Sequence, residues 1–372
     1  MSKVNVRQRG PPAASVMKPP EETKSEGPPR KNPNRAGRPL GKKKRTITDA
    51  TTKEEVEPTV EDNGEAKRKV EGKRKTQLKA SKGLGAVTPE AETAMSAFVQ
   101  ATTTLGIEGL KKEFADIKGY ASPTMEINAC RANETRNRYK DVVCLDSSRV
   151  TLTLNVPPEG DYIHANWGPL DTTISDFWRM VHQEGVTTIL MLCRTEESGK
   201  VKCSQYWPLE QGAYQTYGSM FVNNKKVEKE DKFTTFTLEV LPEGCSNSTI
   251  TKIFQMSDWP DRGVPQSSMT VLRLLKLVVA GGPCIVHCSA GVGRTGTIIA
   301  IEACIQRLMK GQQVAMKDLF MQLRNQRASS IQTEGQYCFV HLSVINYIGA
   351  KLKKFESVRK QFNTEFASAT LN

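Results

Sequence analysis

A glycine-rich segment between two apolar runs constrains the fold of this chain most strongly. The apolar run CIVHC occupies residues 284–288, the segment VHCSAGVGRTG covers 286–296, and TIIAIEACIQRLM follows at 297–309. The first run predicts a buried strand, and the last predicts a helix that is apolar on nearly all sides and therefore buried. Glycines between a strand and a helix let successive backbone N–H groups converge at the helix N-terminus, where they bind an anion.

Two common glycine motifs do not explain this segment. Three of its glycines formally satisfy G-x-G-x-x-G of dinucleotide-binding domains, and Gly291 and Gly296 bracket four residues as in a P-loop. A P-loop requires Lys after its last glycine, but Thr297 follows the segment. Neither motif uses a Cys or an Arg here. The converging N–H groups and the positive end of the helix dipole favour a thiolate at Cys288. The planar guanidinium of Arg294 can bind two phosphate oxygens. Together these residues predict nucleophilic attack on a phosphoryl group.

Strands and helices alternate over the rest of the chain. Apolar runs predict strands at 186–193, 218–224, 232–240, 249–256 and 283–288, and helical patterns cover 172–185, 265–282, 297–309, 314–326 and 333–350. Thr88 as N-cap and Pro89 at the first helical position predict a further helix start. Because several strands follow one another directly, we expect an α/β fold with a mixed twisted β-sheet flanked by helices.

The N-terminal segment differs in composition. Its first 90 residues lack Phe, Tyr and Trp, contain ten of the 19 prolines, and carry 22 Lys and Arg against 12 Asp and Glu. Such a segment buries too little apolar surface to offset its chain entropy. We therefore expect a disordered basic tail at 1–87, a catalytic domain at 88–350, and a basic and polar C-terminal extension at 351–372, whose helix we expect to fray.

Cysteine and histidine placement argues against a metal site. The nine cysteines all follow residue 129 and form no C-x-x-C pair, and the four histidines are scattered. We expect a reduced, intracellular chain without metal or cofactor and, because no apolar run has the length of a membrane span, without such a span. The location is expected to be cytoplasmic, with a nuclear location as the alternative if KKKR at 42–45 acts as an import signal.

The string HCSAGVGRTG at 287–296 resembles the signature of the cysteine-dependent protein tyrosine phosphatases, specifically the non-receptor, tyrosine-specific group. The resemblance implies that fold, and hydrolysis of phosphotyrosine in proteins through a phosphocysteine intermediate. Cys288 would be the nucleophile and Arg294 the phosphate-binding cation. The loop residues that would bind the phosphate are Ser289, Ala290, Gly291, Val292 and Gly293.

Other segments resemble the remaining loops of the same family, and the matches together cover about residues 94–350. DWPDRGVP at 258–265 resembles its mobile acid loop, which makes Asp261 the general acid and Trp259 the anchor of a hinge. A general acid fits the chemistry, since the leaving phenolate of tyrosine has a pKa of ~10. RNRYKDV at 136–142 resembles the phosphotyrosine-recognition loop, in which Tyr139 stacks on the substrate ring and Asp141 accepts hydrogen bonds from the substrate backbone.

The last two matches concern hydrolysis of the intermediate and support of the site. In IQTEGQY at 331–337, Gln332 would orient the attacking water with Gln336 in support, and in EESGKVKCSQYWP at 196–208, Glu197 and Lys202 would brace the acid and cysteine loops. Thr295 would donate to the departing thiolate, and His287 would orient the cysteine loop.

Two alternatives stay open at this point. The chain could be a catalytically weak phosphotyrosine-binding pseudophosphatase on the same fold, although such proteins usually lose the Cys, the Arg or the acidic Asp. It could also be a phosphatase that its basic tail tethers to nucleic acid. The expected partners are accordingly phosphotyrosine-containing proteins, with nucleic acid as the alternative.

Overall fold

The computed structural model describes residues 87–165, 167–279 and 282–370. The helices are α1 (Pro89–Ile117), α2 (Asn128–Ala132), α3 (Ile174–Gln183), α4 (Ser268–Val279), α5 (Arg294–Met309), α6 (Met316–Gln326), α7 (Glu334–Lys351) and α8 (Glu356–Thr370). The strands are β1 (Thr188–Met191), β2 (Glu196–Glu197), β3 (Lys200–Val201), β4 (Tyr214–Tyr217), β5 (Met220–Lys229), β6 (Thr234–Pro242), β7 (Thr249–Gln255) and β8 (Cys284–His287). Most of the predicted tail lies outside the described residues.

The main sheet is mixed, as predicted. Its strand order is β4-β5-β6-β7-β1-β8, and β1 pairs in parallel with both β7 and β8, whereas β4 to β7 pair antiparallel. In the register of β1 with β8, Met191 lies opposite His287. The two strands therefore end together, and the loops that follow them meet at one edge of the sheet.

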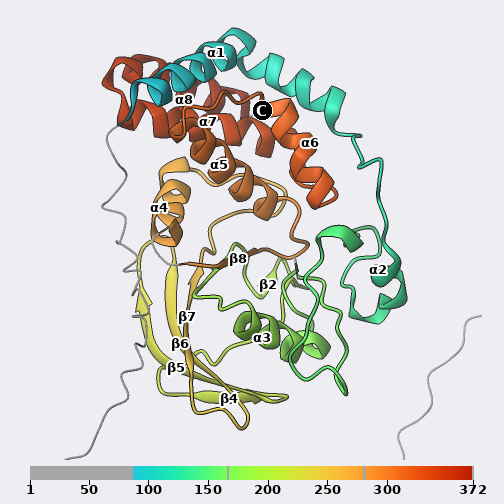
Figure 1. Ribbon diagram of the computed structural model, residues 1–372. Helices are drawn as coiled ribbons and strands as arrows, with labels where there is room; N and C mark the ends of the chain where they lie inside the picture. Colours follow the sequence, from blue (N-terminus) through green and yellow to red (C-terminus); the bar gives the residue numbers. More distant parts are fainter. Residues whose placement is uncertain (1–86, 166, 280–281, 371–372) are drawn as a thin grey trace, which may run out of the picture. The chain divides into compact units, whose positions relative to one another are not determined.

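Helices cover both faces of this sheet (Figure 1). Alternate residues of β1 point to opposite sides: Leu190 joins the core of α1 and α4 to α8, and Ile189 joins the core that contains α3. A strand buried on both faces reads as a continuous apolar run, which is why the sequence predicts β1 correctly. α5 is packed within the first core, in agreement with its apolar sequence.

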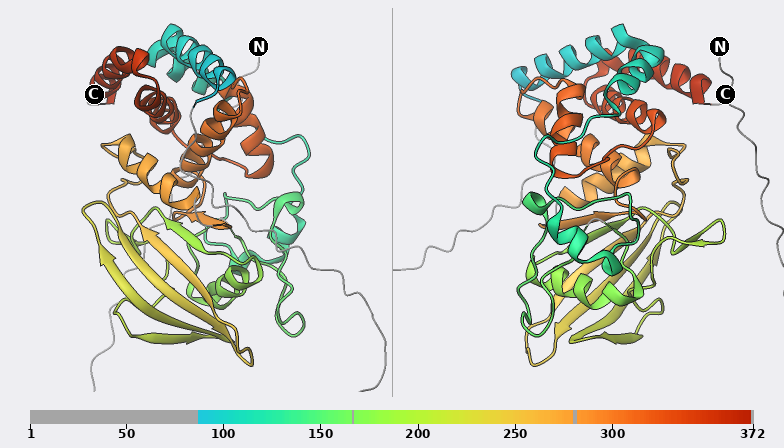
Figure 2. Two further views of the ribbon diagram at one scale, coloured as in Figure 1. Left: turned by 60° about the vertical axis from the view of Figure 1, so that its left-hand side comes forward. Right: turned by 90° about the vertical axis from the view of Figure 1, so that its right-hand side faces the viewer.

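The helix prediction is confirmed at the N-terminal end of the domain and corrected at the C-terminal end. Thr88 Oγ1 caps α1 by accepting a hydrogen bond from the backbone N–H of Ala91 at 3.2 Å. The polar C-terminal segment forms α8, and instead of fraying away from the domain it buries Phe362 and Phe366 in the core of α7. α1 and α8 lie side by side over α7 in both views of Figure 2. The strand β4 has no counterpart among the predictions, because its residues are mostly exposed and do not alternate.

Candidate active site

The loop between β8 and α5 holds Cys288 at the edge where the parallel strands end. The Cys288 side chain is buried, and its Sγ accepts a hydrogen bond from the backbone N–H of Gly291 at 3.2 Å. Gly291 has a φ of +64°, a conformation that glycine adopts without strain and that turns its N–H toward the sulfur. Helix α5 begins at Arg294, so the positive end of its dipole adjoins the same sulfur.

Arg294 is fixed beside this loop by a carboxylate. Its two terminal nitrogens each lie 2.6 Å from an oxygen of Glu197, and Nη1 also donates to the carbonyl of Leu192 at 2.8 Å. Burial disfavours the guanidinium charge, but the hydrogen bonds and the charge of Glu197 outweigh burial and raise the pKa of Arg294. The guanidinium is thus a permanent cation with a fixed plane.

A short hairpin sets the position of Glu197. Strands β2 and β3 pair antiparallel and are joined by a turn at Ser198 and Gly199. The φ angles of these two residues, +51° and +70°, are those of a tight two-residue hairpin turn. The hairpin delivers Glu197 to Arg294 and, just past β3, Lys202 to the acid loop.

The acid loop brings Asp261 over the cysteine loop. One carboxylate oxygen of Asp261 lies 2.7 Å from Lys202 Nζ, and the other lies 3.1 Å from Arg294 Nη2. Partial burial raises the pKa of the Asp261 carboxyl, but the hydrogen bonds from Lys202 and Arg294 have the larger combined effect and lower it. In this arrangement Asp261 is an ionised carboxylate that occupies part of the anion-binding capacity of Arg294.

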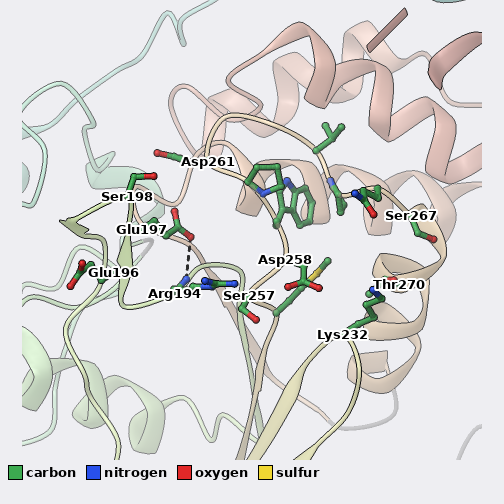
Figure 3. A pocket seen from close by; sticks show the side chains of 16 residues that line it. Arg194, Glu196, Glu197, Ser198, Lys232, Ser257, Asp258, Asp261, Ser267 and Thr270 are labelled. Atoms are coloured by element: carbon green, nitrogen blue, oxygen red, sulfur yellow. Dashed lines mark hydrogen bonds between the residues drawn. The ribbon is translucent and has the colours of Figure 1, made fainter. Parts of the chain in front are cut away.

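Two carboxylates of the loop lie in different surroundings. Figure 3 looks into a cavity of about 650 Å³ beside the acid loop and shows Asp258 among Arg194, Ser257 and Lys232, with Asp261 apart from them at the other end of the segment. Only Asp261 also lines the pocket above Cys288. Trp259, between the two, is buried and donates from Nε1 to the carbonyl of Gly263 at 3.0 Å, so it closes the loop on itself instead of lining that pocket.

Tyr139 forms another wall of the site. Its hydroxyl lies 2.7 Å from Ser289 Oγ, and Ser289 Oγ donates to the carbonyl of Lys202 at 2.8 Å. Because the serine has a single hydroxyl proton, Tyr139 is the donor in its bond with Ser289. The Tyr139 ring meets the Trp167 ring edge to face, with centroids 5.9 Å apart. One serine thereby links three loops that are distant in sequence.

The pocket above Cys288 gathers most of the predicted residues into a volume of about 130 Å³. Its walls are formed by Tyr139, Asp141, Val142, Lys202, Asp261, Arg262, Cys288, Ser289, Ala290, Gly293, Arg294, Gln332 and Gln336. The two glutamines are joined, since the Gln332 backbone N–H donates to Gln336 Oε1 at 2.9 Å. Two predicted residues stand behind the wall: Val292 is buried against Val142, and Thr295 Oγ1 is buried without a hydrogen-bond partner among the described residues.

His287 has the surroundings of an orienting residue. Its Nδ1 lies 3.1 Å from the carbonyl oxygen of Cys288, and its Nε2 lies 2.8 Å from the Tyr206 hydroxyl. A carbonyl can only accept, so Nδ1 carries the proton and Nε2 accepts from Tyr206. Complete burial lowers the pKa of His287 to about 4, which keeps the ring neutral near pH 7.

Sequence reasoning missed one residue that supports the cysteine loop. Arg327 donates from Nη2 to the carbonyl of Ala290 at 2.9 Å and from Nε to that of Gly291 at 3.3 Å. These bonds hold the cysteine loop at Ala290 and Gly291, and the N–H of Gly291 donates to Cys288 Sγ. Burial lowers the pKa of Arg327 to about 10, which still leaves it charged at neutral pH. Arg327 lies five residues before Gln332, and no spacing or motif in the sequence signals it.

The described part of the chain offers no group of three or more Cys, His, Asp or Glu side chains arranged to hold a metal ion. All nine cysteines are free thiols. Within the same residues, no helix is both long enough and apolar enough to cross a bilayer.

Comparisons with known proteins agree with this geometry. Residues 133–346 match the protein-tyrosine phosphatase family. Over 254 residues the chain is 35% identical to receptor-type tyrosine-protein phosphatase F of Danio rerio, a match that covers 63% of this chain and 13% of that protein. It is 34% identical to tyrosine-protein phosphatase non-receptor type 9 of Rattus norvegicus over 275 residues, 64% of this chain and 46% of the rat protein. The chain thus spans less than half the length of these two relatives.

A solved structure shares the fold. It is described as the structural basis of PTPN18 fingerprint on distinct HER2 tyrosine phosphorylation sites, and it superposes with a TM-score of 0.62 at 30% sequence identity. The match covers 68% of this chain and 98% of that one.

Proposed function

The chain belongs to the protein-tyrosine phosphatase family, and from that premise we propose that it hydrolyses phosphotyrosine in protein substrates through a phosphocysteine intermediate. The observation that carries the proposal is the convergence of Cys288, Arg294 and Asp261 in one pocket. An inactive binding module on this fold has no need of all three. Their joint presence therefore favours the enzyme over the pseudophosphatase.

The first step is the attack of Cys288 Sγ on phosphorus. The hydrogen bond from the Gly291 N–H and the start of α5 stabilise a negative sulfur. The phosphate dianion takes the place of the Asp261 carboxylate on Arg294, while Glu197 keeps the guanidinium plane fixed. The S–P bond forms as the P–O bond to the tyrosine ring breaks.

Departure of the tyrosine requires a proton. Asp261, released from Arg294 and placed next to a dianion, binds a proton and donates it to the leaving phenol oxygen. In the second step Gln332, held by Gln336, orients a water molecule toward the phosphocysteine. Asp261 takes a proton from that water, inorganic phosphate forms, and Cys288 leaves as a thiolate.

The walls of the pocket favour tyrosine over serine as the phosphate carrier. Tyr139 is tied to the cysteine loop through Ser289, so its ring extends the pocket outward from the sulfur. A phosphotyrosine side chain spans this depth, with its ring against Tyr139, whereas phosphoserine is too short. Asp141, exposed at the same wall, accepts hydrogen bonds from the substrate backbone in this proposal.

The experiment is a phosphate-release assay on three peptides of one sequence that carry phosphotyrosine, phosphoserine or phosphothreonine, with and without EDTA. We expect release from the phosphotyrosine peptide alone, unaffected by EDTA. Equal rates on all three peptides, or loss of activity in EDTA, would contradict the proposal. Tight binding of phosphotyrosine without release would favour the pseudophosphatase.

The basic segment carries a second, separate proposal about partners and location. Its charge favours anionic partners such as nucleic acid, and KKKR at 42–45 favours a nuclear fraction beside the cytoplasmic one. The test compares the full chain with a chain that lacks residues 1–87, in DNA binding at rising salt and in location within cells. Equal DNA affinity and equal location of the two chains would refute it.

A further inference from the structure

Arg262, the residue after the proposed acid, has no assigned role in this reaction. It lines the pocket above Cys288, and its side chain is exposed. Among the described residues it has no ion-pair partner, unlike Lys202 and Arg294, which are both engaged by carboxylates. An unpaired guanidinium at the mouth of a phosphate pocket is available to a substrate.

The backbone holds this side chain at the mouth. Arg262 has a φ of +59°, a left-handed conformation that is unfavourable for residues other than glycine. Its carbonyl accepts a hydrogen bond from Thr333 Oγ1 at 3.2 Å, which ties it to the segment that follows Gln332. The acid loop is thus fastened at two adjacent residues, by Asp261 to Lys202 and by Arg262 to Thr333.

The other charges near the mouth do not neutralise Arg262. Lys140 and Asp141 are both exposed on the segment that carries Tyr139, and neither forms an ion pair with another described residue. Asp141 is the carboxylate that the proposed function assigns to the substrate backbone. Among the described residues, Arg262 in the pocket wall and Lys140, next to Tyr139 in the chain, are therefore both cations without an ion-pair partner.

We propose that Arg262 determines substrate specificity by binding an acidic side chain within two residues of the phosphotyrosine. This inference rests on the proposed function of the same site. A guanidinium binds a carboxylate through two parallel hydrogen bonds, a geometry that neither Gln nor Lys reproduces. The substrate class is then a phosphotyrosine peptide with a flanking Glu or Asp.

The position of Arg262 on the acid loop links this recognition to the rate of the reaction. When the substrate phosphate binds Arg294, Asp261 loses one of its two ion-pair partners. An ion pair between Arg262 and a flanking carboxylate replaces that lost anchor one residue away. An acidic flank therefore raises kcat as well as lowering KM, whereas a cation on the Tyr139 segment, such as Lys140, affects KM alone.

The test measures kcat and KM on three phosphotyrosine peptides that differ only in having Glu, Gln or Lys at the flanking positions. For the wild type we expect kcat/KM to be about 3- to 10-fold higher with Glu than with Gln, with part of the gain in kcat. The gain is smaller at high salt, because the ion pair is exposed. Arg262→Gln should remove the kcat part of the gain, and Arg262→Glu should reverse the preference toward the Lys peptide.

Each variant is compared with itself on two peptides, so a change in its overall rate cancels. Lys140→Gln is the matched control and should keep the Glu-over-Gln gain in kcat. A wild type that hydrolyses all peptides equally, or an unchanged preference in Arg262→Gln, overturns this inference and leaves the proposed function standing. No phosphate release from any peptide overturns both.

Discussion

Glu197 binds both terminal nitrogens of Arg294, each at 2.6 Å, although the two residues are 97 positions apart. The pair fixes the guanidinium plane before any phosphate arrives. Glu197→Gln keeps the shape but removes the charge, so Arg294 loses its orientation and pairs more strongly with Asp261. We expect kcat to fall by about 10- to 100-fold.

A neighbouring carboxylate provides the control for that variant. Glu196 lies beside Glu197 in β2, is exposed, and does not line the pocket above Cys288. Glu196→Gln should change kcat by less than about twofold. Equal loss of activity in the two variants would mean that the charge of the hairpin, and not the contact with Arg294, is what matters.

Replacement of the nucleophile separates chemistry from folding. Cys288→Ser should lower kcat by about 10⁴-fold or more, because a hydroxyl is barely ionised at neutral pH. Cys245 is exposed in the turn after β6, so Cys245→Ser should retain full activity. The measurements are steady-state kinetics on a phosphotyrosine peptide and the thermal melting of each variant. Substantial turnover by Cys288→Ser would remove Cys288 from the mechanism.

Tyr139 contributes a hydroxyl and a ring, which two substitutions distinguish. Tyr139→Phe loses only the hydrogen bond to Ser289, so kcat/KM should fall by about 2- to 10-fold. Tyr139→Ala also loses the wall that meets the substrate ring and should cost a further 10-fold or so, with the larger effect in KM. Competitive inhibition by inorganic phosphate serves as the reference, since phosphate has no ring to pack. An equal loss in phosphate affinity and in kcat/KM for the peptide would contradict the role in tyrosine selection.

The sequence predicts the parts of this site that short contiguous strings specify. CIVHC followed by the glycine segment predicts β8, the loop and α5, because a buried strand, a tight turn and a buried helix each have a local pattern. DWPDRGVP locates Asp261 in the same way, and Figure 3 shows that Asp261 and Asp258 lie at different places around the cavity. The family comparison then agrees with the fold that these strings imply.

What the sequence does not predict depends on contacts between distant segments. Arg327 supports the cysteine loop through backbone carbonyls, which accept from any donor and leave no pattern in the sequence. The lowered pKa of Asp261 depends on Lys202, 59 positions away, and on Arg294. The packing of α8 was missed because Phe362 and Phe366 are two apolar residues in a polar segment, a spacing that becomes meaningful only against α7.

Deletion of the basic segment tests the predicted domain boundary. Because residues 1–87 contain no aromatic residue and little apolar surface, a chain that starts at residue 88 should keep the kcat of the full chain on a small aryl phosphate. Thr88 must be retained, since it caps α1. A loss of more than about 3 °C in melting temperature, or a marked loss of kcat, would refute the boundary.

The ionisation of Asp261 leads to a prediction about pH. In the free protein burial raises the pKa of the Asp261 carboxyl, but Lys202 and Arg294 together lower it by more, so the carboxyl is ionised at neutral pH, although its proposed role as general acid needs the protonated form. A bound phosphate dianion takes Arg294 and adds negative charge nearby, and both changes favour the protonated form, so the pKa rises in the complex. The profile of kcat/KM reports the free enzyme and that of kcat reports the complex. The alkaline limb of kcat should therefore lie at higher pH than that of kcat/KM.

Asp261→Ala tests whether this limb belongs to Asp261. The variant leaves phenolate to depart unprotonated, so kcat should fall by about 10²–10⁴-fold, and the alkaline limb of the kcat profile should disappear. Substrate affinity should persist or increase, because a carboxylate that competes for Arg294 is removed while Tyr139 is unchanged, so the variant should retain phosphorylated partners from cell extract. Asp258→Asn is the matched control and should keep both the rate and the limb, since Asp258 does not line the pocket above Cys288. An alkaline limb that survives in Asp261→Ala and vanishes in Asp258→Asn would show that Asp258, and not Asp261, is the general acid.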